Sequence, residues 1–305
     1  MANNRLAAAG HLSALFCILI WGTTFISTKV LLIDFSPVEI LVLRFVMGFI
    51  ALFVAYPKRV KAASWREELL FAGAGFCGVT LYFLMENVAL TYTLASNVGV
   101  IVSIAPFFTA ILSHFFLKGE KLSSSFLIGF IIAMAGVFLI GYNTNQVLKL
   151  NPTGDLLALL AALAWALYST LMRKIREMNY NTIGCTRRVF LYGLILMIPA
   201  LFLMDFQPDF SKLFMPVNLL NLLFLGLFAS ALCFVLWNWT VGILGAVKTS
   251  LYIYIVPVVT MIAAALLLNE TITLTAIIGA SLALVGMFLA ERKEKTAAAG
   301  EAAGL

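Results

Sequence analysis

Four of the charged side chains inside the long apolar stretches of the chain are the first candidates to bind a solute or carry a proton. They are Lys29, Arg44, Glu86 and Arg188. A charged side chain in hydrocarbon costs about 2.5–3.5 kcal/mol on insertion scales, so such residues are read first as functional. Arg44 and Glu86 have opposite charges, and we expect them to form a buried pair. Because burial favours the protonated form of a carboxyl group, Glu86 is also the first candidate for proton coupling.

Structural roles are the alternative for the same residues. Together with Glu39, the residues Lys29, Arg44 and Glu86 could form a neutral cluster in a solute pathway, or they could hold helices together. Lys29 and Glu39 could also extend to the membrane interface. His114 is the second candidate for proton coupling, and its alternative role is packing against its neighbours.

Aromatic and amide side chains inside the apolar stretches form a second group of candidates. They could line a pocket for a flat or cationic solute through stacking and cation–π contacts. These residues are Trp21, Tyr82, Asn97, Trp165, Tyr168, Trp237, Asn238, Tyr252 and Tyr254. Packing, or a place in the aromatic belt at the membrane surface, is the alternative for each aromatic residue.

The elements that hold these residues must be stable in lipid. Of the 305 residues, 63% are apolar and 11% are charged, and the mean hydropathy is +1.04. A soluble domain is about 45–50% apolar and about 25% charged. The composition therefore argues against a soluble enzyme, a nucleic-acid-binding protein and a secreted disulfide scaffold. The four cysteines lie in apolar stretches without a C-x-x-C pair, so we expect neither a disulfide framework nor a metal site.

Ten apolar runs divide the chain, each about as long as a membrane-spanning helix. They cover residues 11–32, 37–56, 67–90, 94–117, 123–142, 153–173, 182–204, 217–240, 246–268 and 272–290. The runs are continuously apolar rather than alternating, which favours helices over a transmembrane β-barrel. We therefore predict an all-α integral membrane protein with ten transmembrane helices.

The positions of Lys and Arg predict the orientation of these helices. With ten spans, both termini lie on the same side of the membrane. That side carries thirteen basic residues, namely Arg5, Lys58, Arg59, Lys61, Arg66, Lys118, Lys121, Arg173, Lys174, Arg176, Arg292, Lys293 and Lys295. The opposite side carries only Lys149 and Lys212. Because basic residues accumulate on cytoplasmic loops, we expect cytoplasmic termini and a location in the cell inner membrane.

The sequence also matches itself, which divides it into a first half (residues 1–148) and a second half (residues 149–305). At an offset of 144, the matched pairs are Trp21 and Trp165, Lys29 and Arg173, and Arg44 and Arg188. At an offset of 151, they are Asn87 and Asn238, Ala95 and Ala246, and Pro106 and Pro257. At an offset of 150, they are Glu120 and Glu270, Gly129 and Gly279, and Gly136 and Gly286. Each half has five spans, an odd number, so the second half is inverted relative to the first. Inverted repeats are typical of secondary transporters, which bind substrate near the membrane midplane between the halves.

The repeat suggests roles for several matched residues. Pro106 and Pro257 interrupt hydrogen bonding in equivalent spans, so we expect kinks there that act as gates or as static bends. The matched glycines predict close packing by spans 5 and 10. Glu120 and Glu270 are expected to cap the helices that follow them. Arg188 has no carboxylate in its own half, and we expect it to meet a substrate carboxylate or a backbone carbonyl.

Several motifs carry a resemblance to a known family. They are Trp21-Gly22, Pro37-x6-Arg44, Ala95-x10-Pro106 and Glu120-x8-Gly129-x6-Gly136, and the last two recur as Ala246-x10-Pro257 and Glu270-x8-Gly279-x6-Gly286. With these motifs in this order, the chain from about residue 11 to residue 290 resembles the EamA-type ten-span exporters of the drug/metabolite transporter superfamily. The second half departs from the pattern at Asn181, where the first half has Pro37, and at Trp165-Ala166, where it has Trp-Gly.

This resemblance implies a basket-like bundle in which spans 1–4 and 6–9 line a central cavity and spans 5 and 10 pack outside. It also implies the export of small metabolites. We therefore expect a secondary transporter that exports an amino acid, an amine or a related amphipathic compound by alternating access. A proton-coupled exporter of drugs or other cations is the alternative, with Glu86 as the proton carrier.

Two other classes of function remain, a non-transporting membrane scaffold and an integral-membrane enzyme. The sequence lacks the H-E-x-x-H and G-x-S-x-G motifs and a phosphate-binding glycine loop. We therefore expect no enzyme activity, no catalytic residue and no cofactor. The expected partners are the solute and the lipid bilayer, without nucleic acid, and a monomer suffices for this function.

Overall fold

The computed structural model describes residues 2–93, 95–117, 123–142, 151–204, 206–207, 209–268 and 272–291. Within these ranges the chain is helical, without a β-strand. Several predictions concern residues outside them, namely the helix caps at Glu120 and Glu270 and the basic residues Lys118, Lys121, Lys149, Arg292, Lys293 and Lys295.

The first half forms five helical spans. Spans 1 and 2 are α1 (Ala2–Leu31) and α2 (Pro37–Ala55). Span 3 consists of α3 (Trp65–Gly75), the π-helical turn η1 (Phe76–Leu81) and α4 (Tyr82–Tyr92). Span 4 consists of α5 (Ala95–Val102) and α6 (Ala105–Phe116), and span 5 is α7 (Ser124–Tyr142).

The second half repeats this order. Spans 6 and 7 are α8 (Pro152–Glu177) and α9 (Thr182–Leu203), and the short α10 (Phe210–Leu213) follows them. Span 8 consists of α11 (Pro216–Leu223), the π-helical turn η2 (Phe224–Leu232) and α12 (Cys233–Leu244). Span 9 consists of α13 (Ala246–Leu251), the 3-10 turn η3 (Tyr252–Ile255) and α14 (Val256–Leu268), and span 10 is α15 (Leu274–Glu291).

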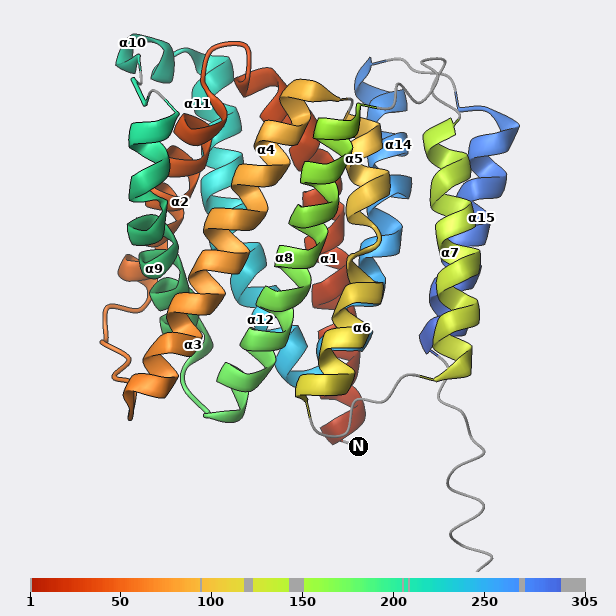
Figure 1. Ribbon diagram of the computed structural model, residues 1–305, viewed down its shortest axis with the longest axis horizontal. Helices are drawn as coiled ribbons and strands as arrows, with labels where there is room; N and C mark the ends of the chain where they lie inside the picture. Colours follow the sequence, from red (N-terminus) through yellow and green to blue (C-terminus); the bar gives the residue numbers. More distant parts are fainter. Residues whose placement is uncertain are drawn as a thin grey trace, which may run out of the picture.

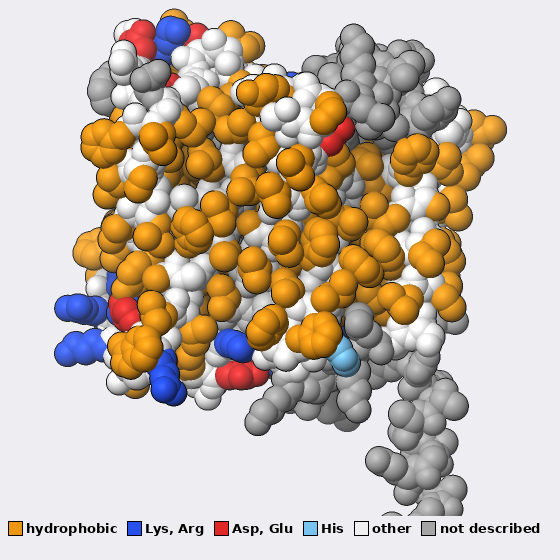
Figure 2. Space-filling model, in the orientation of Figure 1, with side chains coloured by type: hydrophobic (Ala, Val, Ile, Leu, Met, Phe, Trp, Pro, Cys, Tyr) orange, Lys and Arg blue, Asp and Glu red, His pale blue; other side chains and the backbone are white. Residues whose placement is uncertain are grey.

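These spans form a bundle with an apolar belt. In the described ranges, nine helices are long and apolar enough to cross a membrane, and a shorter apolar helix, Ser124–Ile140, occupies the place of the remaining predicted span. Hydrophobic side chains cover the middle of the visible face, and the charged side chains in view lie near its two ends (Figure 2). This arrangement confirms an all-helical, multi-pass membrane protein.

Local capping explains where two equivalent helices begin. Ser36 and Glu39 form a capping box at the start of α2, with Pro37 in the first turn. At the start of α9, the side chain of Asn181 accepts a hydrogen bond from the Gly184 backbone N–H at 3.1 Å. The departure from the family pattern at Asn181 therefore preserves a helix start through a different cap.

Helices α7 and α15 pair at one edge of the bundle (Figure 1). A Cβ atom on Gly286 would lie 2.6 Å from the Ala133 Cα, and one on Gly279 would lie 2.7 Å from the Gly136 carbonyl oxygen. The backbones therefore touch through the glycines predicted for close packing. Residue numbers rise along one helix as they fall along the other, so the pair is antiparallel, as an inverted repeat requires.

Four of the spans are irregular at equivalent places. The π-helical turns η1 and η2 lie at matching positions of spans 3 and 8. Span 4 is interrupted at residues 103–104, directly before Pro106, and η3 lies directly before Pro257 in span 9. The regular α-helix is thus interrupted close to both prolines, and their role as gates or static bends stays a prediction.

Candidate functional site

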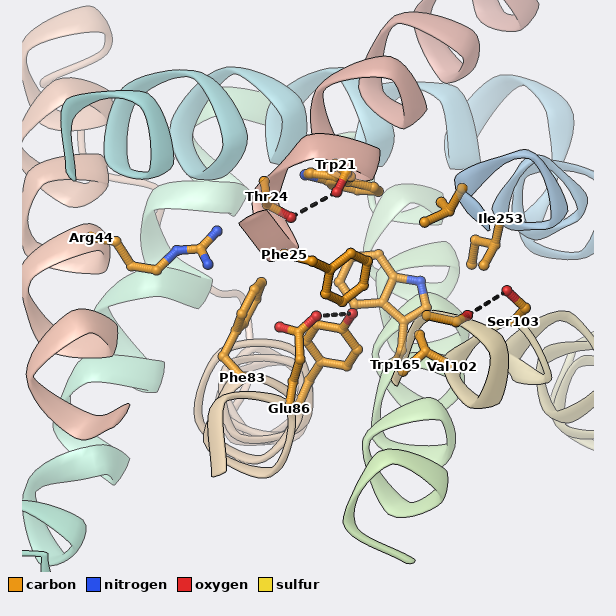
Figure 3. Close-up of a pocket in the computed structure, with 13 residues that line it drawn as sticks. Trp21, Thr24, Phe25, Arg44, Phe83, Glu86, Val102, Ser103, Trp165 and Ile253 are labelled. Atoms are coloured by element: carbon orange, nitrogen blue, oxygen red, sulfur yellow. Dashed lines mark hydrogen bonds between the residues drawn. The ribbon is translucent and has the colours of Figure 1, made fainter. Parts of the chain in front are cut away.

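A cavity lies between the two halves of the bundle (Figure 3). Its volume is about 530 Å³, with the space at its opening included. The lining residues come from spans 1–4, 6 and 9, and they are Trp21, Thr24, Phe25, Arg44, Tyr82, Phe83, Glu86, Gly99, Val102, Ser103, Trp165, Ile253 and Val256. The walls are therefore mainly aromatic and apolar, with one cation and one carboxylate.

Arg44 supplies the positive charge of the cavity, and its side chain is held on two sides. Only 2% of Arg44 is exposed. Its Nε donates a hydrogen bond to the Ser230 hydroxyl oxygen at 3.0 Å, and its guanidinium carbon lies 4.3 Å from the centre of the Phe83 ring. Ser230 belongs to η2, so a π-helical turn of the second half orients a charged residue of the first half.

Glu86 supplies the negative charge, and it is 6% exposed. The hydroxyl of Tyr82, one turn earlier in α4, donates a hydrogen bond to its carboxylate at 3.2 Å. The head groups of Arg44 and Glu86 both point into the cavity (Figure 3). The direct ion pair that the sequence suggested is not formed, because no described contact of 4.0 Å or less joins the two groups. Each charge instead has a neutral hydrogen-bond partner.

Two repeat-related tryptophans meet at the cavity. The rings of Trp21 and Trp165 are perpendicular, with their centres 5.3 Å apart. The ring of Trp165 also lies 4.9 Å from that of Tyr82, and Trp21 lies 4.9 Å from Trp237. Among the candidates from the sequence, the fold brings Trp21, Arg44, Tyr82, Glu86 and Trp165 together at this cavity.

Lys29 does not line the cavity. Its ammonium group donates to the carbonyl oxygens of Leu90 at 2.8 Å and Thr93 at 3.2 Å, at the C-terminal end of α4. Its repeat counterpart Arg173 donates to the carbonyl of Gly242 at 3.0 Å, at the end of α12. Both cations satisfy carbonyls that a helix end leaves unpaired, so their role is structural.

Glu39 is also structural. Its carboxylate accepts hydrogen bonds from the backbone N–H groups of Ser36 at 2.7 Å and Gln207 at 3.0 Å. It thus caps α2 and fixes the chain that leads to α10, and it is not among the cavity-lining residues.

Arg188 corrects another expectation. Its guanidinium donates to the Val60 carbonyl, as expected, but it also pairs with the carboxylate of Glu68 and lies over the ring of Phe71. The expectation concerned carboxylates in the same half as Arg188, whereas Glu68 lies in α3 of the first half. Because α9 packs against α3, the partner comes from the other repeat. The side chain of Arg188 is therefore paired with residues outside the cavity.

The other predicted residues lie outside the cavity lining, and they are Asn97, Tyr168, Trp237, Asn238, Tyr252 and Tyr254. Tyr168 donates to the Asn238 side-chain oxygen at 2.7 Å, and Asn238 donates to Thr186 at 3.0 Å, which forms a buried polar chain between α8, α12 and α9. His114, the second proton-coupling candidate, is exposed at the end of α6. It lies beside Phe115 rather than at the cavity.

The sequence reasoning missed most of the apolar lining and the residue that orients Arg44. The missed residues are Thr24, Phe25, Phe83, Gly99, Val102, Ser103, Ser230, Ile253 and Val256. The sequence repeat could have identified Phe83, because the offset of 151 aligns it with Phe234. The two rings lie 6.0 Å apart in the centre of the bundle.

Comparison with known proteins identifies relatives along nearly the whole chain. The model of the EamA-like transporter family matches residues 8–142 and again residues 152–291. An uncharacterized transporter of Archaeoglobus fulgidus is 30% identical over 90% of this chain and 95% of its own length. A probable amino-acid metabolite efflux pump of Escherichia coli is 25% identical over 90% of this chain and 92% of its own length.

A solved crystal structure has the same fold. It superposes with a TM-score of 0.72 at 21% identity and covers 93% of this chain and 96% of its own. Two family matches that together span both halves, and a full-length relative at 30% identity, agree with the motifs and the helical bundle. The chain therefore belongs to the EamA-like transporter family, within the drug/metabolite transporter superfamily.

Proposed function

We propose that this protein exports a small zwitterionic metabolite, of the amino-acid type, by alternating access. One observation carries the proposal: Arg44 and Glu86, both more than nine-tenths buried, line the same aromatic cavity without a direct ion pair. Charges held apart in this way are available to a solute that bears both signs. Similarity to the Escherichia coli relative, a probable amino-acid metabolite efflux pump, supports the same class of solute.

The cavity chemistry suits such a solute part by part. A planar guanidinium matches the two oxygens of a carboxylate, so Arg44 would take the carboxylate of the solute. Glu86 would take the ammonium group. The rings of Phe25, Phe83 and Trp165 would pack against an apolar side chain.

The alternative solute, a cation exchanged for a proton on Glu86, has different requirements. It needs the carboxylate of the cavity but not the guanidinium. Solutes that differ only in their charged groups therefore distinguish a zwitterion exporter from a cation exporter.

Thermal unfolding of the purified protein with three related solutes tests the proposal. We expect phenylalanine to raise the melting temperature, and phenethylamine and hydrocinnamate, which each lack one charged group, to have little effect. A ligand at 100 times its Kd stabilises the folded state by about 2.7 kcal/mol. Arg44→Gln is the control and should abolish the shift. Equal stabilisation by phenethylamine would favour the cation exporter. An unchanged melting temperature with all three solutes would contradict the proposal that the cavity binds this class of solute.

We also propose that residues 1–148 and 149–305 are inverted repeats with both termini in the cytoplasm, in the inner membrane. The two separate family matches and the antiparallel pairing of α7 and α15 support this arrangement. The loop after α2 and the chain before α10 lie at opposite ends of the bundle (Figure 1).

Cysteine labelling tests this orientation. Lys61 and Gln207 are both exposed, in the loop after α2 and before α10 respectively. An impermeant thiol reagent on intact cells should therefore label Gln207→Cys but not Lys61→Cys. Labelling of Lys61→Cys alone would reverse the orientation, and labelling of both would contradict the ten-span topology.

A further inference from the structure

Gly99 of α5 lines the cavity, and helix packing does not explain why this residue has no side chain. A Cβ atom added to Gly99 would have one atom from another described part of the chain within 4 Å, the Phe25 Cε2 at 4.0 Å. A Cβ added to Gly129, by contrast, would lie 2.3 Å from the backbone nitrogen of Ala290. The space beside Gly99 is therefore open, whereas Gly129 is needed for close contact between helices.

The backbone conformation at Gly99 does not require glycine either. Gly99 lies inside α5, and among the described residues a positive φ occurs only at Asn179 and Gly245. The offset of 151 pairs Gly99 with Ser250, a buried residue of span 9 whose Cβ the bundle accommodates. Glycine is less favourable than alanine inside a helix, because it loses more backbone freedom on folding. What glycine provides at position 99 is space in the cavity.

The side of the cavity next to Gly99 is largely apolar. Val102 and Ser103 follow Gly99 by three and four residues, so they share its face of α5, and Ile253 lies on the same side of the cavity (Figure 3). The hydroxyl of Ser103 donates to the Gly99 carbonyl oxygen at 2.7 Å, so this donor is used within its own span. Arg44 lies on the opposite side (Figure 3). The space at Gly99 is thus separated from the cation that would bind the solute carboxylate.

We propose that Gly99 determines how large an apolar side chain the exported solute can have. With its carboxylate at Arg44 and its ammonium group at Glu86, the solute extends its side chain toward α5 and fills the space beside Gly99. An aromatic or long aliphatic side chain fits there, and a larger residue at position 99 excludes it. This inference rests on the zwitterion exporter proposed above and adds the size class of its solute.

A hinge is the other role that a glycine could have here, because span 4 is interrupted at residues 103–104. The hydrogen bonds favour the size limit. The backbone N–H and the hydroxyl of Ser103 both donate to the Gly99 carbonyl oxygen, at 3.2 and 2.7 Å, so the turn that follows Gly99 is held in place. A hinge would affect all solutes alike, whereas a size limit affects only large ones.

Binding of phenylalanine and valine to the purified full-length protein tests the size limit. The measurement is the solute concentration that gives half of the maximal rise in melting temperature. Gly99→Val should weaken phenylalanine binding about tenfold, which corresponds to 1.4 kcal/mol, because its methyl groups overlap the solute ring. It should change valine binding by less than about threefold, because the smaller solute leaves room for those methyl groups. Gly99→Ala adds a single methyl group and should give a smaller effect with the same preference for valine.

Two further variants control for effects on the helix. Gly73→Val makes the same change in α3, at a residue that does not line the cavity and where an added Cβ would lie 3.4 Å from Leu171 Cδ1. It should bind both solutes as the parent protein does. Phe25→Leu removes ring atoms beside position 99, so the double variant Gly99→Val with Phe25→Leu should regain most of the phenylalanine binding.

The possible outcomes separate the size limit from the transport function. Equal weakening of both solutes by Gly99→Val, or unchanged binding of both, overturns the size limit and leaves the exporter in place. Unchanged binding together with equally slower transport of both solutes in proteoliposomes would identify a hinge, and it also overturns the size limit. If neither solute changes the melting temperature of the parent protein, the zwitterion exporter is overturned, and the size limit with it.

Discussion

Replacing Arg44 with glutamine is expected to lower solute transport by about a hundredfold. Arg44 is the one cation among the cavity-lining residues of the described chain. A charge-assisted hydrogen bond contributes about 1.5–3 kcal/mol, and about 2.7 kcal/mol corresponds to a hundredfold change in rate. Initial rates in proteoliposomes, at solute concentrations well below KM, measure this loss.

The same substitution should also lower stability, because it leaves the buried carboxylate of Glu86 without a counter-charge. Two unit charges 4 Å apart interact by about 4 kcal/mol at an effective dielectric constant of about 20, and these charges lie farther apart. We therefore expect the free energy of unfolding to fall by about 2 kcal/mol.

The double variant Arg44→Gln with Glu86→Gln should recover most of this stability but none of the transport. Arg44→Lys is the matched control, since it retains the charge and loses the planar fork. If the double variant is no more stable than Arg44→Gln alone, the two charges do not interact and the cavity is not a site for both signs.

Valine in place of Gly136 or Gly286 is expected to be the most destabilising single change outside the cavity. A Cβ on either glycine would overlap backbone atoms of the partner helix, among them the Gly129 carbonyl oxygen at 2.6 Å from the Cβ of residue 286. Backbone atoms in a helix cannot move aside as a flexible side chain can. Overpacking usually costs about 1–3 kcal/mol, and we expect the upper end of that range.

The melting temperature in detergent measures this effect. Ser281→Val is the matched control for Gly286→Val, because Ser281 lies on α15 like Gly286, has an exposed side chain and receives the same substituent. Melting of Gly286→Val and Ser281→Val at the same temperature would mean that the contact between α7 and α15 contributes little to stability.

The sequence predicted the helices well because the relevant forces are local. A run of apolar residues sets the length of a span, and Ser36, Pro37 and Glu39 set the start of α2 through contacts within four residues. The π-helical turns η1 and η2 were not predicted, because no residue type marks them. Their positions follow from packing between spans.

The candidate site was predicted less completely, for a related reason. Trp21, Arg44 and Glu86 were candidates from the sequence because charged and large aromatic residues stand out from the aliphatic residues of an apolar run. A structural role was one alternative for Lys29, but its acceptors were not predicted, because they are backbone carbonyls, which every residue has. Ser230 and Glu68 were missed because each one contacts a residue of the other half, and those pairings exist only in the folded bundle.

The glycine contact between α7 and α15 also bears on how the chain is made. About 130 residues separate the two helices, and ribosomes add about 5–20 residues per second, so α15 emerges on the order of ten seconds after α7. During that interval the glycine-lined face of α7 is inserted in lipid without its partner. Helices with such faces associate readily, so two nascent first halves could pair through α7. We therefore expect that membrane assembly of this protein requires synthesis of the second half before two first halves meet.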